Sequence, residues 1–185
     1  MFYNKRMFHA ALAPGLELRM LEERHAPQLF AVIDGERDYL RTWLAWVDAT
    51  ETVEDTTTFI KSALELFATN AAFAAAIWNQ SEIAGVIGLH KIDWLNRKVE
   101  IGYWLASGFQ GKGIMTAACR AMISHAFGEL DLHRVSIECA VGNEKSCAIP
   151  RRLGFTAEGT RREAQLLSGR YHDTLVFSML KQDWK

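Results

Sequence analysis

Gln110-Gly-Lys-Gly113 is a short segment whose residue types favour the binding of phosphate. It follows an apolar stretch typical of a strand and precedes a helical pattern over 113–130. Glycines let the backbone approach a ligand closely, and the free amides at the start of a helix, backed by its dipole, attract anions. Lys112 adds a positive charge. The segment therefore predicts a site for a phosphate-bearing ligand.

Two common phosphate-binding motifs do not fit this segment. A Walker A loop would need glycine and then serine or threonine where the chain has Ala106 and Gly113. A dinucleotide-binding fingerprint that begins at Gly111 would need a third glycine where Thr116 stands, and no βαβ unit surrounds the segment. On these residues alone, a glycine-rich turn that only starts a helix is the alternative.

Composition excludes several other classes of function. The net charge of −1 is too small for wholesale nucleic-acid binding, which usually needs a strongly basic face. The three cysteines form no CxxC pair, and the six histidines show no HxxxH or HExxH spacing. We therefore expect neither a disulfide framework nor a metal site. Reduced thiols are typical of a cytoplasmic protein, which is the location that we expect.

No segment predicts a membrane span or a cleaved leader. The longest apolar run is the eight residues 71–78, whereas a membrane helix needs roughly 20. Lys5 and Arg6 precede an apolar stretch that is too short for a signal peptide and contains His9. A membrane partner is therefore not expected.

Helical and strand patterns alternate along the chain, which predicts a mixed α/β (α+β) fold. The length of 185 residues suits one core and is short for two, so residues 1–185 are expected to form a single domain. Strands are expected over 16–21, 73–78, 83–90, 99–106 and 134–141, and over 156–180 as a hairpin that turns at 167–169. Helices are expected over 23–32, 39–47, 53–69, 113–130 and 144–153.

Charge is distributed unevenly between the two halves. Residues 17–65 carry eleven acidic against five basic side chains, a net charge of −6. Residues 97–185 carry thirteen basic against nine acidic side chains, a net charge of +4. The acidic part suits a cationic acceptor and the basic part an anionic cofactor, and two solvated surfaces of opposite charge are the alternative.

The stretch from Glu100 to Thr116 resembles motif A of the GNAT superfamily of N-acetyltransferases, whose pattern is Gln/Arg-x-x-Gly-x-Gly/Ala. Gln110 and Gly113 match this pattern, whereas Met115 stands where the family usually has glycine or alanine. Further along the chain, 143–146 (Asn-Glu-Lys-Ser) and 152–155 (Arg-Leu-Gly-Phe) are similar to the second motif of the family.

The resemblance extends over nearly the whole chain to the RimL- and RimJ-like branch of ribosomal-protein N-terminal acetyltransferases. The matching segments are Leu16–Arg19, Leu40–Trp43, Glu100–Leu105, Gly159 and Gly169–Asp173. This resemblance implies a single GNAT-type domain with a mixed, mostly antiparallel sheet flanked by helices. The sheet would splay open between its fourth and fifth strands, expected here at 99–106 and 134–141. It also implies an acyltransferase that moves an acetyl group from acetyl-CoA to a primary amine by direct attack.

The same resemblance implies which residues bind the cofactor. The backbone of Tyr103, Trp104 and Leu105 would pair with pantetheine and polarise the thioester carbonyl. The pyrophosphate would bind at the loop and the first helical turn, which comprise Gln110, Gly111, Lys112, Gly113, Ile114, Met115 and Thr116. Asn143 would reach the pantetheine from the end of the other strand.

Catalytic groups are implied as well. Many family members carry a tyrosine seven residues after the asparagine, where this chain has Pro150, which offers no hydroxyl and should kink its helix. Ser146 is the expected acid, through a hydrogen bond to the departing sulfur. A serine that only satisfies amides of the first helical turn is the alternative.

For the general base, Glu100 is the first choice and Glu138 the alternative. RimL-like enzymes offer a further acid in the segment where this chain has Glu163 and Gln165. Each of these glutamates could instead be an exposed strand residue.

The leading interpretation, which the resemblance implies, is acetylation of the N-terminal α-amine of a ribosomal or other protein. The family's first two helices wall the acceptor side, and they lie in the acidic part of this chain. A basic N-terminal segment is the expected acceptor. A small amine, such as a polyamine or an aminoglycoside, is the alternative substrate, and a CoA-binding module without turnover is the third interpretation. The tryptophans are expected to pack in cores or interfaces, and relatives are often dimeric, so a homodimer is a further expectation.

Overall fold

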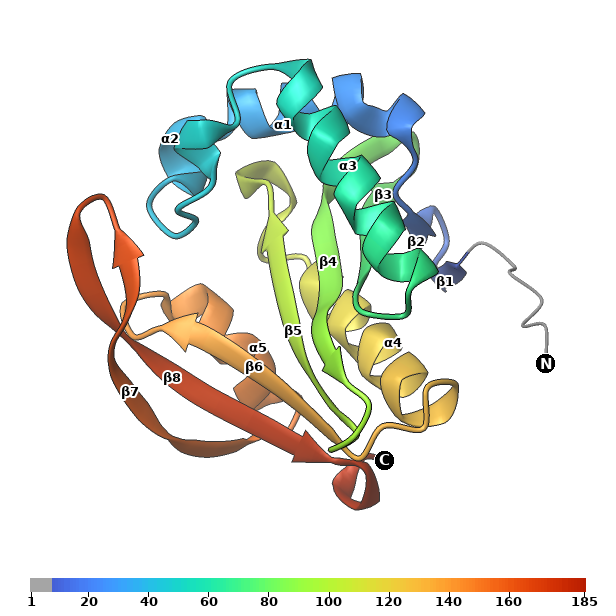
Figure 1. The fold of residues 1–185 in the computed structure, drawn as a ribbon, viewed down its shortest axis with the longest axis vertical. Helices are drawn as coiled ribbons and strands as arrows, with labels where there is room; N and C mark the ends of the chain where they lie inside the picture. The colour runs from blue at the N-terminus through green and yellow to red at the C-terminus, as the bar shows by residue number, and fades with distance from the viewer. Residues whose placement is uncertain (1–7) are drawn as a thin grey trace.

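Eight strands form one sheet in the order β1-β2-β3-β4-β5-β6-β8-β7 (Figure 1). The computed structural model of the protein describes residues 8–185, so Lys5 and Arg6 lie outside the described residues. Only β5 and β6 run parallel, and every other neighbouring pair is antiparallel. The strands are β1 (His9–Ala13), β2 (Leu16–Met20), β3 (Phe73–Asn79), β4 (Glu82–Asp93), β5 (Lys98–Leu105), β6 (Arg134–Ala140), β7 (Thr156–Leu167) and β8 (Arg170–Leu180).

The sheet opens between β5 and β6 (Figure 1). These strands pair at only three positions, Lys98–Glu100 with Arg134–Ser136. Beyond this point β5 stays on β4 up to Leu105, and β6 stays on β8 up to Ala140. Alternate backbone groups of each strand therefore face the gap without a partner strand. The predicted splay of the sheet is confirmed. It lies between the fifth and sixth strands of the chain, and not between the fourth and fifth, because the sequence did not predict β1.

Helices cover both faces of the sheet. The α-helices are α1 (Ala26–Gly35), α2 (Arg37–Leu40), α3 (Val53–Ala68), α4 (Ile114–Gly128) and α5 (Glu144–Arg152), and short 3₁₀ turns occupy Glu23–His25, Val47–Ala49, Ser107–Phe109 and Lys181–Asp183. Helices α1 and α3 pack together over one face of β3 and β4, whereas α4 contacts β1, β2, β4, β5 and β6. Helix α5 packs against β6 and β8.

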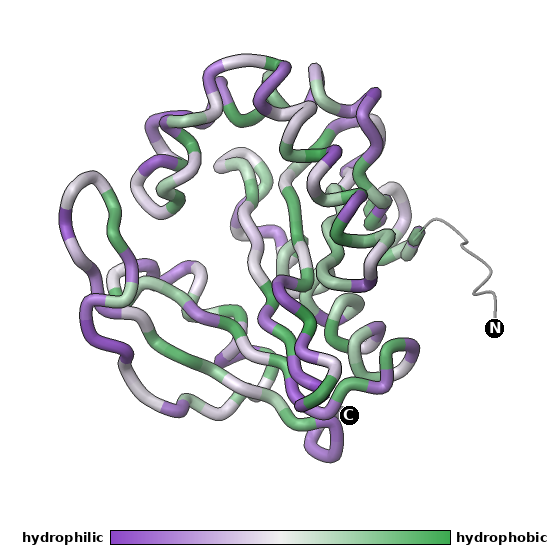
Figure 2. The backbone as a smooth tube through the Cα atoms, in the orientation of Figure 1, coloured by the Kyte–Doolittle hydropathy of each residue, from purple (hydrophilic) through white to green (hydrophobic). Residues whose placement is uncertain are grey.

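Side chains of β3 divide between two apolar cores. Ala75 and Ile77 belong to the core beneath α4, and Ala76 and Trp78 belong to the core beneath α1 and α3. A strand buried on both faces reads as a continuous apolar run, which explains the pattern at 71–78. Figure 2 shows this hydrophobic centre and the more hydrophilic β7–β8 hairpin.

The predicted helix over 39–47 is wrong for most of its length. Helix α2 ends at Leu40, and the chain then turns. The guanidinium of Arg37 donates hydrogen bonds to the carbonyls of Val47 and Thr50, each at 2.7 Å, and folds the following segment back on α2. A continued helix could not offer both carbonyls to one side chain on its first turn.

Boundaries of the other predicted elements agree with the structure to within about three residues, except that the segment at 23–25 is a 3₁₀ turn and that α1 continues to Gly35. Strand β1 was missed because its sequence, His-Ala-Ala-Leu-Ala, contains no β-branched residue, and it is placed by pairing with β2. Among residues 8–185, no helix has both the length and the apolar character needed to cross a bilayer.

Candidate active site

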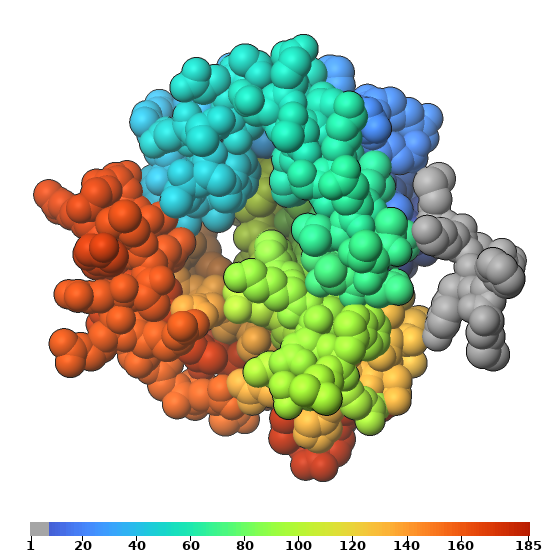
Figure 3. All heavy atoms as spheres, viewed as in Figure 1, coloured from blue at the N-terminus to red at the C-terminus, as the bar shows by residue number. Residues whose placement is uncertain are grey.

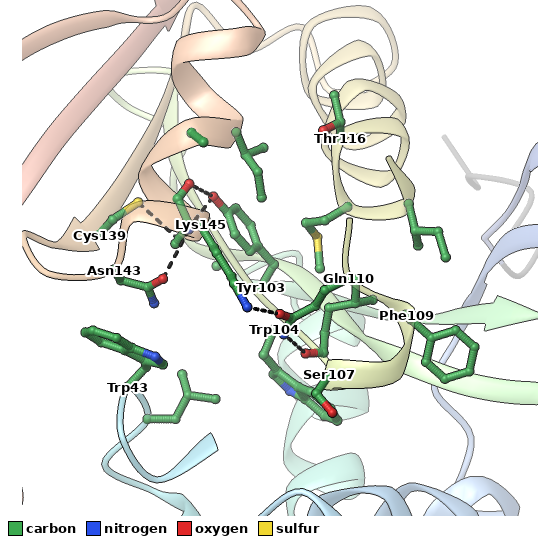
Figure 4. A pocket seen from close by; sticks show the side chains of 18 of the residues that line it. Trp43, Tyr103, Trp104, Ser107, Phe109, Gln110, Thr116, Cys139, Asn143 and Lys145 are labelled. Carbon is green, nitrogen blue, oxygen red and sulfur yellow. Dashed lines mark hydrogen bonds between the residues drawn. The ribbon is translucent and has the colours of Figure 1, made fainter. Parts of the chain in front are cut away.

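A cavity of about 1170 Å³ lies at the opening between β5 and β6 (Figure 4). Ligand pockets usually measure about 300–1,000 Å³, so this cavity has room for a large and extended molecule. Its walls come from β5, the loop and first turns of α4, the end of β6, α5, the end of α2 and the β7 strand. Figure 3 shows the molecule hollowed between the α2 segment, the β7–β8 hairpin and the β4–β5 region.

The start of α4 has the geometry of an anion site. Gly113 is the N-cap residue with φ 76°, and Gly111 has φ 73°, conformations that favour glycine. The amide of Ala117 donates to the carbonyl of Gly113 at 3.0 Å. Within the described chain, no acceptor is found for the amides of 111–116, and all of these residues except Lys112 line the cavity, at the positive end of the α4 dipole.

Two residues of the predicted cofactor loop are turned away from this site. The Nζ of Lys112 donates to the carbonyl of Gly108 at 2.8 Å and lies over the ring of Phe109, and Lys112 is not part of the cavity wall. Met115 borders the cavity, but its side chain is buried in the core beneath α4. The residue that departs from the family pattern, Met115, therefore packs its side chain in the core and not against the anion site.

Gln110 links the two sides of the opening. Its Nε2 donates to the carbonyl of Leu105 at 3.2 Å, and its Oε1 accepts a hydrogen bond from the Nζ of Lys145 on α5 at 2.9 Å (Figure 4). Tyr103, Trp104 and Leu105 also line the cavity, so β5 and the loop form one continuous wall.

Three basic side chains of the cavity wall were not predicted. Arg152 donates to the hydroxyl of Thr116 at 2.8 Å, and Arg120 and Lys145 line the same wall. Arg120 lies four residues after Thr116, which places both on one face of α4. That helical spacing is the signal from which Arg120 could have been predicted, whereas Lys145 and Arg152 reach the loop only through the tertiary fold.

Ser146, Tyr103 and Cys139 meet on the α5 side of the cavity. The Oγ of Ser146 lies 3.4 Å from the Oη of Tyr103 and 3.3 Å from the Sγ of Cys139. Asn143 caps α5 by accepting a hydrogen bond from the amide of Ser146 at 3.1 Å. Burial raises the pKa of the Tyr103 phenol. Burial is also the main cause that raises the pKa of the Cys139 thiol to about 12. Both side chains are therefore uncharged near neutral pH.

Two glutamates lie on the same face of β5 and β6, and only one of them reaches the cavity. Glu138 lines the cavity and accepts hydrogen bonds from Arg161, at 2.8 Å, and from the hydroxyl of Thr174. Glu100 is opposite Ser136, at the last paired position before the sheet opens, and lies outside the cavity wall. Burial, and then the nearby carboxylate of Glu138, raise the pKa of Glu100.

A bridge of polar and aromatic groups encloses the opposite side of the cavity. The Nε2 of Gln165 donates to the carbonyl of Trp43 at 3.1 Å, which connects β7 to the segment after α2. The indole of Trp43 lies 3.5 Å from the position that a Cβ on Gly142 would take. Trp43 and Trp104 both line the cavity; Trp104 was expected there through its backbone, whereas Trp43 was not predicted. Glu163 is exposed and lies outside the cavity wall.

Comparison with known proteins identifies the family. Residues 15–156 match the family model described as acetyltransferase (GNAT) domain. The putative ribosomal N-acetyltransferase YdaF of Bacillus subtilis (strain 168) is 39% identical over 180 residues, which are 97% of this chain and 98% of that protein.

Solved structures show the same relationship. The RimL ribosomal L7/L12 α-N-protein acetyltransferase in complex with coenzyme A is 32% identical with a TM-score of 0.90, over 94% of this chain and 98% of that one. The microcin C7 self-immunity acetyltransferase MccE in complex with acetyl-CoA and AMP is 30% identical with a TM-score of 0.87, over 91% and 94% of the two chains. The chain therefore belongs to the GNAT acetyltransferase family and to its RimL-like branch, and it is an acetyltransferase.

Proposed function

We propose that the protein transfers the acetyl group of acetyl-CoA to the N-terminal α-amine of a ribosomal protein. The observation that carries this proposal is one cavity that joins two sets of free backbone groups. The amides of 111–116 suit a pyrophosphate, and the groups of β5 that face the gap beyond Glu100 suit the amides of a pantetheine chain. The two solved structures named above contain coenzyme A or acetyl-CoA, which supports the same cofactor here.

The residues present fit acetyl-CoA. Gly111, Gly113 and the amides of 114–116 would hold the pyrophosphate, with Arg120 and Arg152 as nearby cations. Lys112 would contribute its amide, since its side chain turns to Gly108. The side-chain oxygen of Asn143 is engaged in capping α5, and its Nδ2 is the group that we assign to the pantetheine.

Bound acetyl-CoA supplies an activated acetyl thioester. The outward-facing backbone amides of 103–105 would donate to its carbonyl oxygen, in the manner of an oxyanion hole. The hydroxyl of Ser146, whose single hydrogen is directed to Tyr103 before the reaction, would turn that hydrogen to the sulfur as the bond to the acetyl group breaks. Hydrogen bonds to Tyr103 and Cys139 hold this hydroxyl at the cavity wall.

Glu138 is the carboxylate that we assign to proton removal, ahead of Glu100, because Glu138 alone of the two lines the cavity. Glu100 is exposed outside the cavity wall and would act only through Glu138 or an intervening water. Glu138→Gln and Glu100→Gln test this order: the first should lower kcat more than the second. A larger loss for Glu100→Gln would restore the order expected from the sequence.

An α-amine suits this site better than a side-chain amine. An α-amine has an ordinary pKa of about 7.7–8.0 and is partly neutral near pH 7, whereas a lysine amine near about 10.4 is almost wholly protonated. An amine that is already partly neutral asks less of Glu138, which also accepts hydrogen bonds from Arg161 and Thr174. The names of the YdaF and RimL relatives support a ribosomal protein as the substrate class.

The experiment is a competition among acceptors, read by mass spectrometry of the products. One peptide has a free N-terminus and no lysine, a second has a blocked N-terminus with lysines, and spermidine is the third acceptor. We expect acetyl-CoA to be consumed with the first peptide at the highest kcat/KM. Equal rates on free and blocked peptides would contradict the α-amine, and CoA binding with no transfer to any acceptor would favour a module without turnover.

A small amine or other small molecule is the second candidate for the acceptor. The MccE neighbour favours this alternative, because its name refers to self-immunity and not to a ribosomal protein. Preference for spermidine over the free peptide in the competition would establish a small amine as the acceptor.

We also propose that residues 1–185 are one acetyltransferase domain, because β3 and β4 contribute to both cores. We propose further that the protein works in the cytoplasm beside ribosomes.

A further inference from the structure

Pro150 leaves one backbone carbonyl of α5 without its helical partner. Helix α5 continues through Pro150 to Arg152. In a continuous α-helix the amide of residue 150 would donate to the carbonyl of Ser146, but proline has no amide hydrogen. Ser146 is half-buried, and a carbonyl shielded from water without a donor is costly, so the carbonyl of Ser146 needs another partner.

The partner comes from the other side of the opening in the sheet. The Oη of Tyr103, on β5, donates to the carbonyl of Ser146 at 3.1 Å. With its hydrogen used in this bond, the Tyr103 oxygen can only accept from the Ser146 hydroxyl, 3.4 Å away. Burial raises the pKa of the phenol, so the donor stays protonated over the working pH range.

We propose that the Tyr103 hydroxyl replaces the amide hydrogen that Pro150 lacks and so positions Ser146 at the cavity wall. The proposal rests on the proposed function, which gives Ser146 its role with the departing sulfur. Tyr103 is then a positioning residue that acts through Ser146. Its side chain also connects β5 to α5 across the opening, so it fixes how far the α5 wall stands from β5.

The test restores the missing amide. Tyr103→Phe removes the hydroxyl and keeps the ring, and Pro150→Ala returns a hydrogen-bond donor to α5. We expect Tyr103→Phe to lower kcat by roughly tenfold and to leave the KM for acetyl-CoA within about twofold. Pro150→Ala alone should stay within about twofold of wild type, and the double variant should recover to within about threefold.

Matched controls separate this mechanism from general damage. Pro27 lies in the first turn of α1, where an amide has no helical acceptor, so Pro27→Ala should not rescue Tyr103→Phe. Tyr171 is 66% exposed and is not part of the cavity wall, so Tyr171→Phe should leave kcat unchanged. In a Ser146→Ala background, Tyr103→Phe should cause no further loss, because the residue it positions is gone.

Thermal unfolding without any ligand gives a readout that does not depend on acetyl transfer. Tyr103→Phe should lower the melting temperature by about 2–4 °C, and Pro150→Ala should remove most of this difference. If the protein proved inactive on every amine, this thermal cycle would still decide whether the two residues are coupled. Losses that add in the double variant, or a Tyr103→Phe variant equal to wild type in kcat and melting temperature, would overturn the proposal. An additional loss in the Ser146→Ala background would instead show that Tyr103 acts directly on the reacting atoms.

Discussion

Replacing Gly113 by aspartate should separate the stability of α4 from the ability of its N-terminus to bind an anion. Gly113 has φ 76°, and a Cβ there would meet no atom within 4 Å, so conformational strain is the only steric cost. That strain is about 1–2 kcal/mol for most residues and smaller for aspartate and asparagine. A carboxylate at the N-cap accepts hydrogen bonds from the first turn and is stabilised by the helix dipole, so folding should change little.

The same carboxylate would face the proposed pyrophosphate site. Two like charges about 4 Å apart repel by about 1 kcal/mol in bulk water and by about 4 kcal/mol near a protein surface. Repulsion of that size raises the Kd for CoA by roughly fivefold to several hundredfold. Gly113→Asn is the matched control, because asparagine has a similar shape and tolerates positive φ but carries no charge.

Calorimetric titration with CoA, together with thermal unfolding without ligand, measures both effects. We expect the aspartate and asparagine variants to melt within about 4 °C of each other. The Kd of the aspartate variant should be at least about fivefold higher, and added salt should narrow this difference in Kd. Equal CoA affinity of the two variants would refute the assignment of 111–116 to the pyrophosphate.

Other predictions concern catalysis, pH and substrate charge. Ser146→Ala should lower kcat without changing the Kd for CoA, and a rate within roughly a factor of two of wild type would assign the proton donation elsewhere. Arg134, and then Ser178, lower the pKa of Glu158 from 4.5 to about 2, so this ion pair contributes stability above pH 4.5 and loses it as the pH falls towards 2. The melting temperature of Glu158→Gln should therefore differ from wild type more at about pH 7 than at about pH 3, and a difference independent of pH would contradict the ion pair. For peptides of equal length, the advantage in kcat/KM of a basic over an acidic sequence should shrink as salt rises, and a flat response would remove charge steering by residues 17–65.

The anion site was predictable because its requirements are local. Glycines with positive φ beside a helix start are recognisable within a few residues of sequence, and Gly111 and Gly113 have the expected geometry. The choice between Glu100 and Glu138 was not local. It depends on where β5 and β6 separate, and that point is set by pairing between strands more than 30 residues apart in the chain. The two strand patterns contain no information on the register between them.

The enclosure of the cavity between β7 and the segment after α2 could not be predicted for a related reason. Gln165 and Trp43 are 122 residues apart and meet through one hydrogen bond. The segment after α2 has a helical pattern, yet Arg37 captures two carbonyls from it and turns it towards the cavity. Strand β1 likewise owes its conformation to its partner β2 and not to its own residues.

The short β5–β6 ladder gives a bound ligand a mechanical role. Three paired positions leave the first five strands and the last three joined mainly through helices and buried side chains. A pantetheine chain in the gap would supply hydrogen bonds to both edges, as an additional strand does. Binding at a hundredfold excess over Kd would then stabilise the fold by about 2.7 kcal/mol. Hydrogen exchange of the backbone amides in 101–105 and 137–140 should slow together when CoA is added. The bound cofactor would then take the place of a strand between the two parts of the sheet.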